Sequence, residues 1–328
     1  MHMSRYGELS IHRWMLRDQG RNEAYRRALE HVVRPGDVVL DVGAGTGILS
    51  IFAASSGARK VYAVERTQVA DVARRMVEQN GHAERIDIIQ CDIEDLVAPE
   101  KVDVIVSEWM GGFGVDENML APLVMARDRW LKPGGKIVPG RVTAWLAPAS
   151  ISEFDEEIAY WRSRPHGVDT SVIATMTAYE TFHTQTRLTL DELIAAPQVM
   201  WSHDPYTCSL EEADRPFTAK LTFEAARAGM ISGFIAWFTA EMGDGGTLTN
   251  AVGAPDTHWG RTWFPLDRAI GVAAGESFGC ELHCDPSSQG SCEFYWSVKM
   301  ANRPLEEHDT RRARRERAIS RSPSDEGR

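Results

Sequence analysis

A glycine-rich turn between a buried strand and a helix constrains the fold of this chain more than any other feature. Residues 38–42 form an apolar run interrupted only by Asp41, as in a strand that is covered on both faces. Glycines follow at positions 43, 45 and 47, and a helical pattern begins at Ile48. Such a turn lets the backbone approach a ligand closely and points the helix N-terminus at it. We therefore expect an α/β fold with a ligand bound at this turn.

Strands and helices alternate from residue 36 to residue 146, which predicts a parallel, Rossmann-type sheet domain. Residues 1–35 have helical periodicity. From 147 to 301 the chain changes to alternating β-like stretches, which predict a mainly antiparallel second domain. Residues 302–328 are rich in charge, then in Ser and Pro, and predict a solvated, disordered tail.

The composition, 43% hydrophobic and 25% charged, is typical of a soluble globular protein. No apolar run approaches the roughly 20 residues that span a membrane, and the first ten residues lack the pattern of a signal peptide. We therefore expect a cytoplasmic protein that does not bind membranes. The net charge of −11 disfavours a nucleic-acid partner, which would need a basic face.

The five cysteines contain no C-x-x-C pair. Cys280 and Cys284 are four residues apart, but no matching pair of histidines lies near them in the sequence. A zinc site there is less favoured than free or buried thiols. We expect no bound metal.

Three acidic residues occur where a parallel sheet would bring them to the glycine turn. Asp41 precedes the turn, Glu65 closes the second strand and Glu94 follows the third. A carboxylate after the second strand is suited to two ribose hydroxyls, and Glu94 to an adenine amino group. Each acid alone is also explained as a solvated loop residue, but the three together indicate a nucleoside cofactor. The G-x-G-x-G spacing differs from the dinucleotide fingerprint, which disfavours NAD, the competing cofactor.

Two glutamates, Glu108 and Glu117, bracket a glycine-rich loop just beyond the fourth strand, at the edge where open α/β sheets bind ligands. The guanidinium group of arginine is a planar fork of donors that pairs bidentately with carboxylates. Two carboxylates can hold this fork and draw its charge toward the nitrogens they contact, so that the remaining nitrogen can attack a sulfonium methyl group. The pattern favours transfer of a methyl group from S-adenosylmethionine to a guanidinium, with catalysis by positioning and electrostatics.

Four segments resemble motifs of the protein arginine methyltransferase family, in the family's order and over most of the chain. Residues 107–120 resemble its double-glutamate loop, and Thr257-His258-Trp259 resembles its Thr-His-Trp loop. Residues 6–25 resemble the helix that caps the cofactor, and residues 160–169 resemble the dimerisation arm. The resemblance implies a Rossmann-type domain followed by a β-barrel-like domain, an inserted helical arm at about 155–190, and a homodimer. It also implies S-adenosyl-L-methionine as cofactor and S-adenosyl-L-homocysteine as product.

The resemblance further implies a role for each matching residue. Glu108 and Glu117 would hold the guanidinium, while His258, paired with Asp18, would help the proton leave. The residues expected to bind the cofactor are Tyr6, His12, Met15, Arg21, Asp41, Gly43, Gly45, Glu65, Ile93 and Glu94. Besides the two glutamates, the residues expected beside the acceptor are Trp259, Met119 and Asp116.

The loop between the glutamates departs from the family pattern. Bulky, often aromatic residues are replaced by Gly-Gly-Phe-Gly-Val-Asp, in which three glycines predict flexibility and Asp116 adds a charge. The long substrate-binding extensions of many relatives are absent, and the Ala-, Arg- and Gly-rich composition resembles that of a high-GC bacterial protein. These features favour free L-arginine as the acceptor, with Asp116 pairing its ammonium group and Nω-methyl-L-arginine as the product. The chain resembles in this respect the free-arginine methyltransferases of nitrosourea antibiotic biosynthesis, such as that of streptozotocin.

Two other functions stay open at this point. One is methylation of arginine within a peptide or protein. The other is a catalytically silent protein that binds the cofactor and regulates a partner. The intact pair Glu108 and Glu117, together with His258, disfavours the silent protein, which would not need them.

Overall fold

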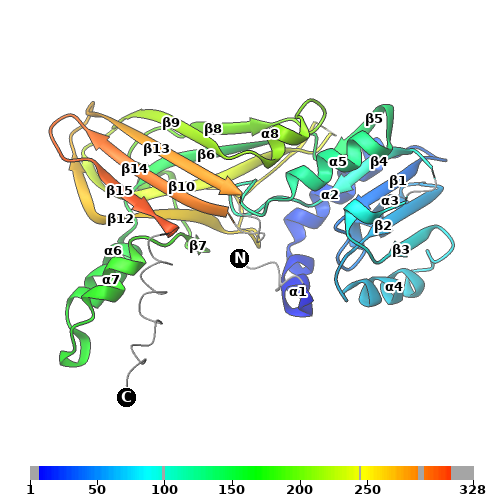
Figure 1. The fold of residues 1–328 in the computed structure, drawn as a ribbon, viewed down its shortest axis with the longest axis horizontal. Helices are drawn as coiled ribbons and strands as arrows, with labels where there is room; N and C mark the ends of the chain where they lie inside the picture. Colours follow the sequence, from blue (N-terminus) through cyan, green and yellow to red (C-terminus); the bar gives the residue numbers. More distant parts are fainter. Residues whose placement is uncertain (1–6, 98–99, 244, 287–291, 312–328) are drawn as a thin grey trace, which may run out of the picture.

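The computed structural model describes residues 7–97, 100–243, 245–286 and 292–311. A parallel-sheet domain and a larger antiparallel domain lie end to end along the long axis of the molecule, and a pair of helices projects from the antiparallel domain (Figure 1). No helix among these residues is both long and apolar enough to span a membrane.

The first domain is a five-stranded parallel sheet in the order β3-β2-β1-β4-β5. Its strands are β1 (Val38–Val42), β2 (Lys60–Val64), β3 (Ile86–Ile89), β4 (Val102–Ser107) and β5 (Leu131–Val138). The helices in this half of the chain include α2 (Gln19–Val32), α3 (Ile48–Ser55), α4 (Ala70–Gln79) and α5 (Leu120–Trp130). All five residues of β1 are buried because β1 lies inside the sheet, between β2 and β4. The strand order reverses between β1 and β4, which is where such sheets bind ligands. The predicted Rossmann-type sheet is confirmed.

The helical N-terminal segment is divided at Asp18 into α1 (Leu9–Arg17) and α2. Asp18 has an extended backbone, with φ −73° and ψ 93°, and its side chain accepts a hydrogen bond from the backbone N–H of Arg21. An aspartate in this position caps the second helix and satisfies a donor that the helix leaves open. The break therefore fixes the Asp18 carboxylate at the corner between the two helices.

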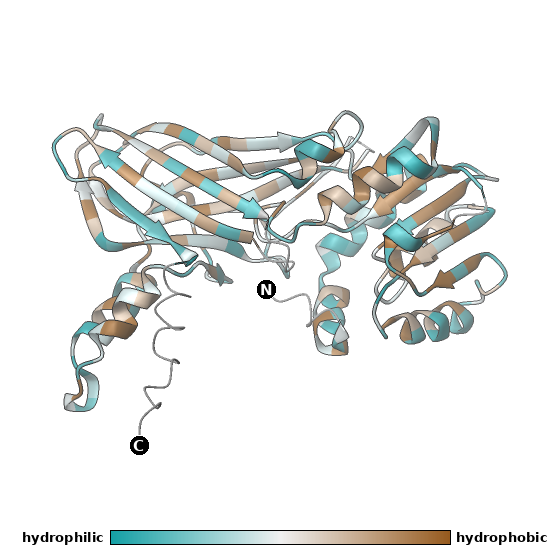
Figure 2. Ribbon diagram, in the orientation of Figure 1, coloured by the Kyte–Doolittle hydropathy of each residue, from teal (hydrophilic) through white to brown (hydrophobic). Residues whose placement is uncertain are grey.

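The second domain is antiparallel, as predicted, and consists of two sheets. One sheet has the order β7-β12-β10-β6-β8, with β11 paired to β10, and the other has the order β15-β14-β13-β9. The strands are β6 (Arg141–Ala149), β7 (Phe182–Thr184), β8 (Gln198–His203), β9 (Phe217–Glu224), β10 (Gly229–Glu241), β11 (Thr247–Thr249), β12 (Arg261–Val272), β13 (Ser277–Pro286), β14 (Cys292–Met300) and β15 (Glu306–Asp309). Hydrophobic and polar residues alternate along several of these strands, because one face of each sheet packs on the core (Figure 2).

The predicted domain boundary at 147 falls inside a strand. All nine residues of β6 pair with β10, beginning at the pair Arg141–Glu241. The antiparallel pairing therefore starts at Arg141, immediately after the parallel sheet ends at Val138.

The projecting arm contains α6 (Ser152–Arg162) and α7 (Ser171–Thr177), which lie within and just before the predicted range 155–190. The two helices pack on each other through a small cluster formed by Ile158, Ala174 and Ala178, with Trp161 against it.

The prediction of a disordered tail from residue 302 is wrong for residues 306–309, which form β15 and pair with β14. His308 in this strand is 1% exposed, and its ring stacks on Trp296 at a centroid distance of 5.1 Å. Its Nδ1 atom lies 2.8 Å from the carbonyl oxygen of Ala178, at the end of α7. A four-residue strand of charged residues has no hydrophobic periodicity, so the sequence did not reveal it. The part of the predicted tail from 312 to 328 lies outside the described residues.

We expect His308→Ala to destabilise the protein by about 2–4 kcal/mol, because it removes a buried ring and leaves the carbonyl of Ala178 without its partner. Glu307→Ala is the matched control, since Glu307 is exposed on the same strand and should change stability by less than about 0.5 kcal/mol. Urea unfolding of the two variants gives the comparison. Equal losses would mean that β15 does not anchor the base of the arm.

Candidate active site

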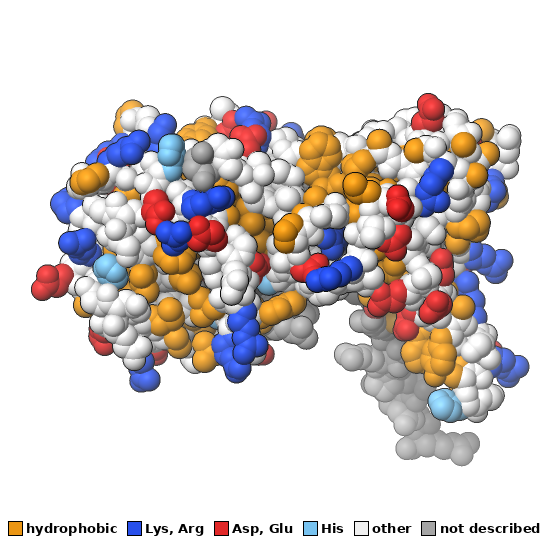
Figure 3. All heavy atoms as spheres, turned by 180° about the vertical axis from the view of Figure 1, so that it is seen from behind, with side chains coloured by type: hydrophobic (Ala, Val, Ile, Leu, Met, Phe, Trp, Pro, Cys, Tyr) orange, Lys and Arg blue, Asp and Glu red, His pale blue; other side chains and the backbone are white. Residues whose placement is uncertain are grey.

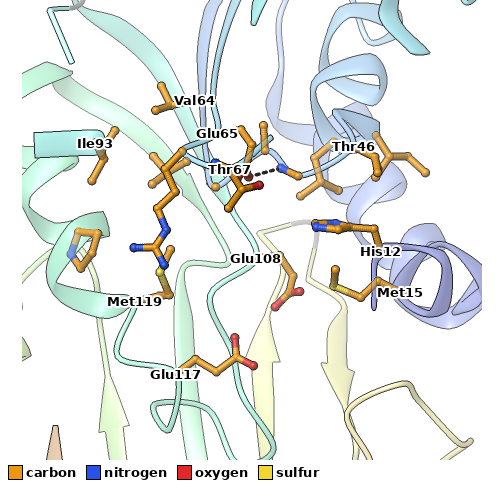
Figure 4. A pocket seen from close by; sticks show the side chains of 18 of the residues that line it. His12, Met15, Thr46, Val64, Glu65, Thr67, Ile93, Glu108, Glu117 and Met119 are labelled. Carbon is orange, nitrogen blue, oxygen red and sulfur yellow. Dashed lines mark hydrogen bonds between the residues drawn. The ribbon is translucent and has the colours of Figure 1, made fainter. Parts of the chain in front are cut away.

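A pocket opens at the carboxyl edge of the parallel sheet, between α1 and the loops that follow β1, β2, β3 and β4 (Figure 4). It encloses about 1250 Å³, including the part that is open to solvent. Eleven of the predicted residues line it: His12, Met15, Arg21, Gly43, Gly45, Glu65, Ile93, Glu94, Glu108, Glu117 and Met119. The structure thus brings together most of the side chains that sequence analysis assigned to the cofactor and the acceptor.

The glycine turn has a backbone that side chains would strain. Gly43, Gly45 and Gly47 have φ values of +74°, +54° and +81°, in the left-handed region. His12 is buried over the turn, and a Cβ atom at Gly45 would lie 3.0 Å from its ring. The turn therefore needs glycine both for its φ angles and for the close contact with α1.

Glu65 is held by the backbone around the turn. Its Oε2 atom accepts from the N–H of Gly45 at 2.9 Å, and its Oε1 atom accepts from the N–H of Thr67 at 2.7 Å. The side chain is almost buried but lines the pocket. A carboxylate can accept about four hydrogen bonds, so both oxygens can still accept from a ligand.

Asp41 does not line the pocket, contrary to the expectation that it reaches the cofactor. Its carboxylate is fully buried, where Oδ2 accepts from the Ser50 hydroxyl on α3 at 2.6 Å and Oδ1 has no hydrogen-bond partner in the part of the chain that the structure describes. Burial raises the pKa of Asp41 to about 7, although the hydrogen bonds from Ser50 act in the opposite direction. Asp41 thus ties the strand before the turn to the helix after it.

Glu108 and Glu117 lie near each other at one end of the pocket, and their carboxylates point toward each other (Figure 4). Glu108 Oε1 accepts from the N–H of Met110 at 3.2 Å, and Glu108 Oε2 lies 3.3 Å from Nη2 of Arg21. The side chains of this ion pair are only 10% and 6% exposed. The buried Nε of Arg21 has no hydrogen-bond partner among the described residues, so Arg21 retains a donor for a ligand.

Asp116 has a different task from the predicted one, because its carboxylate caps its own loop. It accepts from the N–H groups of Gly112 and Phe113 at 3.0 and 3.2 Å, and it is not part of the pocket lining. A Cβ atom at Gly111 would lie 2.3 Å from Asp116. Gly111 therefore allows Asp116 to pack closely against the backbone of its own loop. Asp116 is therefore not placed to pair a substrate ammonium group in the pocket.

His258 and Asp18 form the predicted pair, with His258 Nδ1 and Asp18 Oδ2 2.9 Å apart. The backbone N–H of His258 donates to the same oxygen at 2.8 Å. Burial raises the pKa of Asp18, but hydrogen bonds from the His258 side chain and from two backbone N–H groups lower it more, so the pKa of Asp18 is below that of an ordinary aspartate. Asp18 therefore stays ionised beside the imidazole.

Trp259 is buried, and its Nε1–H donates to the carbonyl of Met110 in the double-glutamate loop at 2.6 Å. Trp259, His258 and Asp18 are not among the residues that line the pocket. Asp18 borders the pocket through its hydrogen bond from the N–H of Arg21, which is a lining residue. Tyr6, which was expected to close over the cofactor, lies outside the described residues.

The pocket also contains residues that sequence analysis did not select. Thr46 belongs to the glycine turn, and Arg66 and Thr67 directly follow Glu65. These three residues could have been predicted, because they are adjacent in sequence to the glycine turn or to Glu65. Pro122 on α5 had no such signal.

The lining fits a positively charged nucleoside cofactor such as S-adenosylmethionine. Five acidic side chains face two arginines: Glu65, Asp92, Glu94, Glu108 and Glu117 against Arg21 and Arg66. An acidic cleft attracts a cationic ligand, and both a sulfonium and a guanidinium are cations. The open donor on Arg21 suits a carboxylate, and the acceptors on Glu65 suit hydroxyl groups. Among the described residues, no cluster of three His, Cys, Asp or Glu side chains could hold a metal ion.

Two family models match the chain. The one described as the arginine methyltransferase oligomerization subdomain matches residues 141–300. The one described as ribosomal protein L11 methyltransferase matches residues 26–138.

The relatives and solved structures to which the chain is similar are also arginine methyltransferases. The chain is 34% identical over 301 residues to protein arginine N-methyltransferase 6 of Danio rerio, covering 89% of this chain and 86% of that protein. It is 37% identical over 243 residues to probable protein arginine N-methyltransferase 6 of Arabidopsis thaliana, covering 72% of this chain but only 55% of that protein. The solved enzyme–prozyme complex of Trypanosoma brucei PRMT1 with AdoHcy superposes with a TM-score of 0.84 at 29% identity, covering 93% of this chain and 98% of that one. Arabidopsis thaliana protein arginine methyltransferase 10 gives a TM-score of 0.77 at 30% identity, covering 94% and 99%.

Asp41→Asn is expected to change how the free energy of unfolding depends on pH. The ordinary pKa of aspartate is 3.8 and that of folded Asp41 is about 7, so between these values the folded state holds a proton that the unfolded state has released. The stability that this proton contributes is complete below about pH 4 and is lost as the pH rises to about 7. Unfolding of the free protein in denaturant across this range should show the asparagine variant gaining stability relative to the wild type as the pH rises. A difference that is constant with pH would contradict the assignment.

Proposed function

The chain belongs to the protein arginine N-methyltransferase family, and we propose that it methylates the guanidinium group of arginine residues in peptides or proteins. The observation that supports this proposal best is the pair of facing carboxylates, Glu108 and Glu117, at the end of the cofactor pocket. S-adenosylmethionine, when bound, supplies the sulfonium methyl group that is transferred to nitrogen. The other steps follow from side chains of this chain.

Glu108 and Glu117 hold the two sides of the guanidinium fork. Glu108 is already fixed by the N–H of Met110 and by Arg21, so it costs little entropy to order when the acceptor binds. The two carboxylates draw the positive charge of the fork to the nitrogens they contact. The third nitrogen then regains its lone pair and is directed into the pocket, which is the positioning and electrostatic catalysis that a nearly always protonated acceptor requires.

His258, which is outside the described pocket lining, is the proposed acceptor of the proton that the methylated nitrogen releases. Its Nδ1 atom is bonded to ionised Asp18, so a neutral ring keeps its proton on Nδ1 and offers Nε2 as the base. Asp18 also stabilises the imidazolium that forms.

Arginine in a polypeptide is a better supported acceptor than free L-arginine. The relatives are named protein arginine N-methyltransferases, and Asp116, the residue expected to pair the free ammonium group, is occupied by its own loop. Free L-arginine therefore lacks the proposed partner for its ammonium group. The alternative of a catalytically silent protein that only binds the cofactor is disfavoured, because both glutamates face the pocket.

The acceptor is tested by comparing kcat/KM for an Arg-Gly peptide, Nα-acetyl-arginine amide and free arginine, with mass spectrometry of the products. A site built for peptides pairs neutral amides and leaves the charged ammonium and carboxylate of the free amino acid unpaired. We expect the peptide to be preferred by at least about tenfold. A preference for free arginine would reverse the assignment, and methylation of none of the three would remove the proposed function.

Glu117→Gln should lower kcat/KM by several hundred-fold, since removing one partner of a buried charge pair costs roughly 3–5 kcal/mol. Cofactor affinity, measured by calorimetry, should change little because Glu117 faces the acceptor end. Asp92→Asn is the control, since it removes one negative charge from an exposed residue of the pocket lining without touching the facing carboxylates. Equal effects of the two changes would show that only the charge of the pocket matters.

The protein is also proposed to act as a homodimer through the arm. The arm exposes four large apolar side chains, Tyr160, Val168, Val172 and Ile173. Apolar surface is visible on the arm in Figure 3. Exposed apolar surface of this kind is typical of an interface. The matching family model, described as an oligomerization subdomain, includes the arm. A second copy of the chain is therefore the proposed occupant.

Val172→Glu should convert the dimer to a monomer in sedimentation velocity at micromolar concentration, because it places a charge in the buried interface. Val199→Glu is the matched control, since Val199 is also an exposed valine but lies on β8, outside the arm. A wild-type monomer, or a Val172→Glu dimer of unchanged affinity, would contradict the proposal.

A further inference from the structure

A buried asparagine that no motif contains connects the double-glutamate loop to the loop that carries His258. Asn250 follows β11 and is 1% exposed. Its Oδ1 atom accepts from the N–H of Phe238 on β10 at 2.8 Å. Its Nδ2 group donates to the carbonyl of Gly112 at 2.7 Å and to the carbonyl of Gly260 at 2.5 Å. Both donors of the amide are therefore used.

The two carbonyls belong to the two loops that carry the proposed chemistry. Gly112 lies within the loop between Glu108 and Glu117, and its N–H is bonded to Asp116. Gly260 directly follows Trp259 and is two residues after His258. One side chain thus fixes the distance between the loop that holds the guanidinium and the loop that receives the proton.

Close packing of the backbone brings the carbonyls of Gly112 and Gly260 within hydrogen-bonding distance of the Asn250 side chain. A Cβ atom at Gly112 would lie 2.3 Å from Thr262 Oγ1, and a Cβ atom at Gly260 would lie 2.4 Å from the carbonyl oxygen of Thr184. Phe238, which donates to Asn250, also packs edge-on against the Trp259 ring at 5.0 Å. The two hydrogen bonds from Asn250 therefore depend on glycine at positions 112 and 260, where a side chain would displace the backbone.

We propose that Asn250 is a positioning residue for methyl transfer, which sets the placement of Glu117 and His258 relative to each other. The proposal rests on the proposed function, and it names a residue outside the pocket. No other common side chain of this size offers two donors and an acceptor in one plane. Aspartate has the shape but would turn a carboxylate toward two carbonyl oxygens.

The test compares Asn250→Ala and Asn250→Ser with Ser232→Ala. Serine offers one donor and cannot bridge both carbonyls, so Asn250→Ser keeps the test valid if the alanine variant does not fold. Ser232 is the matched control because it is also buried, lies on β10 and accepts from the N–H of Ile151, yet contacts neither loop. The readouts are kcat and KM with an arginine peptide, cofactor affinity, and hydrogen exchange of the free protein.

We expect the Asn250 variants to lower kcat by roughly hundredfold, as a displacement of about 1 Å does in a catalytic site. Cofactor affinity should stay within about twofold, since Asn250 is not in the pocket lining. Hydrogen exchange should become faster in residues 109–116 and 257–261 and stay unchanged in the parallel sheet. Ser232→Ala should alter neither kcat nor these exchange rates.

A kcat within about twofold of the wild type in a folded Asn250 variant would overturn the inference. A lower kcat with unchanged exchange in both loops would also overturn it, because the loops would then be placed without Asn250. If the wild type methylates no arginine, the proposed function fails, and exchange alone decides whether Asn250 holds the two loops.

Discussion

The loop that begins at Glu108 and ends at Glu117 leaves the parallel sheet but is packed inside the antiparallel domain. Phe113, near its middle, is fully buried, and its ring lies 5.4–5.8 Å from those of Trp201, Phe264 and Phe294. The separation of the two glutamates therefore depends on how the two domains dock. Burial of one aromatic side chain contributes roughly 3–5 kcal/mol when judged by its truncation, which is enough to hold a loop of ten residues in one conformation.

The same docking is reinforced by polar contacts at the N-terminal helices. Asp18 bonds His258, and Arg21, three residues later, bonds Glu108. The break between α1 and α2 thus connects the cap over the cofactor, the acceptor loop and the antiparallel domain. A ligand that engages Arg21 also acts on Glu108, so cofactor and acceptor share one charged network. This arrangement explains why an acidic pocket contains a buried arginine.

The sequence predicted the parts of the site that come from local patterns. The positions of Gly43, Gly45 and Glu65 follow from strand ends in a parallel sheet, and the pocket contains all three. Contacts between distant segments were not predictable, because one sequence carries no sign of which loops meet. Asp116 was therefore assigned to a ligand although it caps its own loop, and Asn250 was not noticed. The burial of His308 was not predictable for a related reason, since a short strand of charged residues around one histidine shows no hydrophobic periodicity.

The assignment of Glu108 and Glu117 as the guanidinium site is tested most directly by a crystal structure of Glu117→Gln with S-adenosylhomocysteine and an arginine-containing peptide. Glutamine keeps the shape of the site while slowing turnover, so the acceptor can be trapped. The account predicts a guanidinium group between the side chains at 108 and 117, with one terminal nitrogen directed toward the cofactor sulfur. A guanidinium bound elsewhere, or an arginine side chain that contacts neither residue, would contradict the assignment of this loop as the acceptor site.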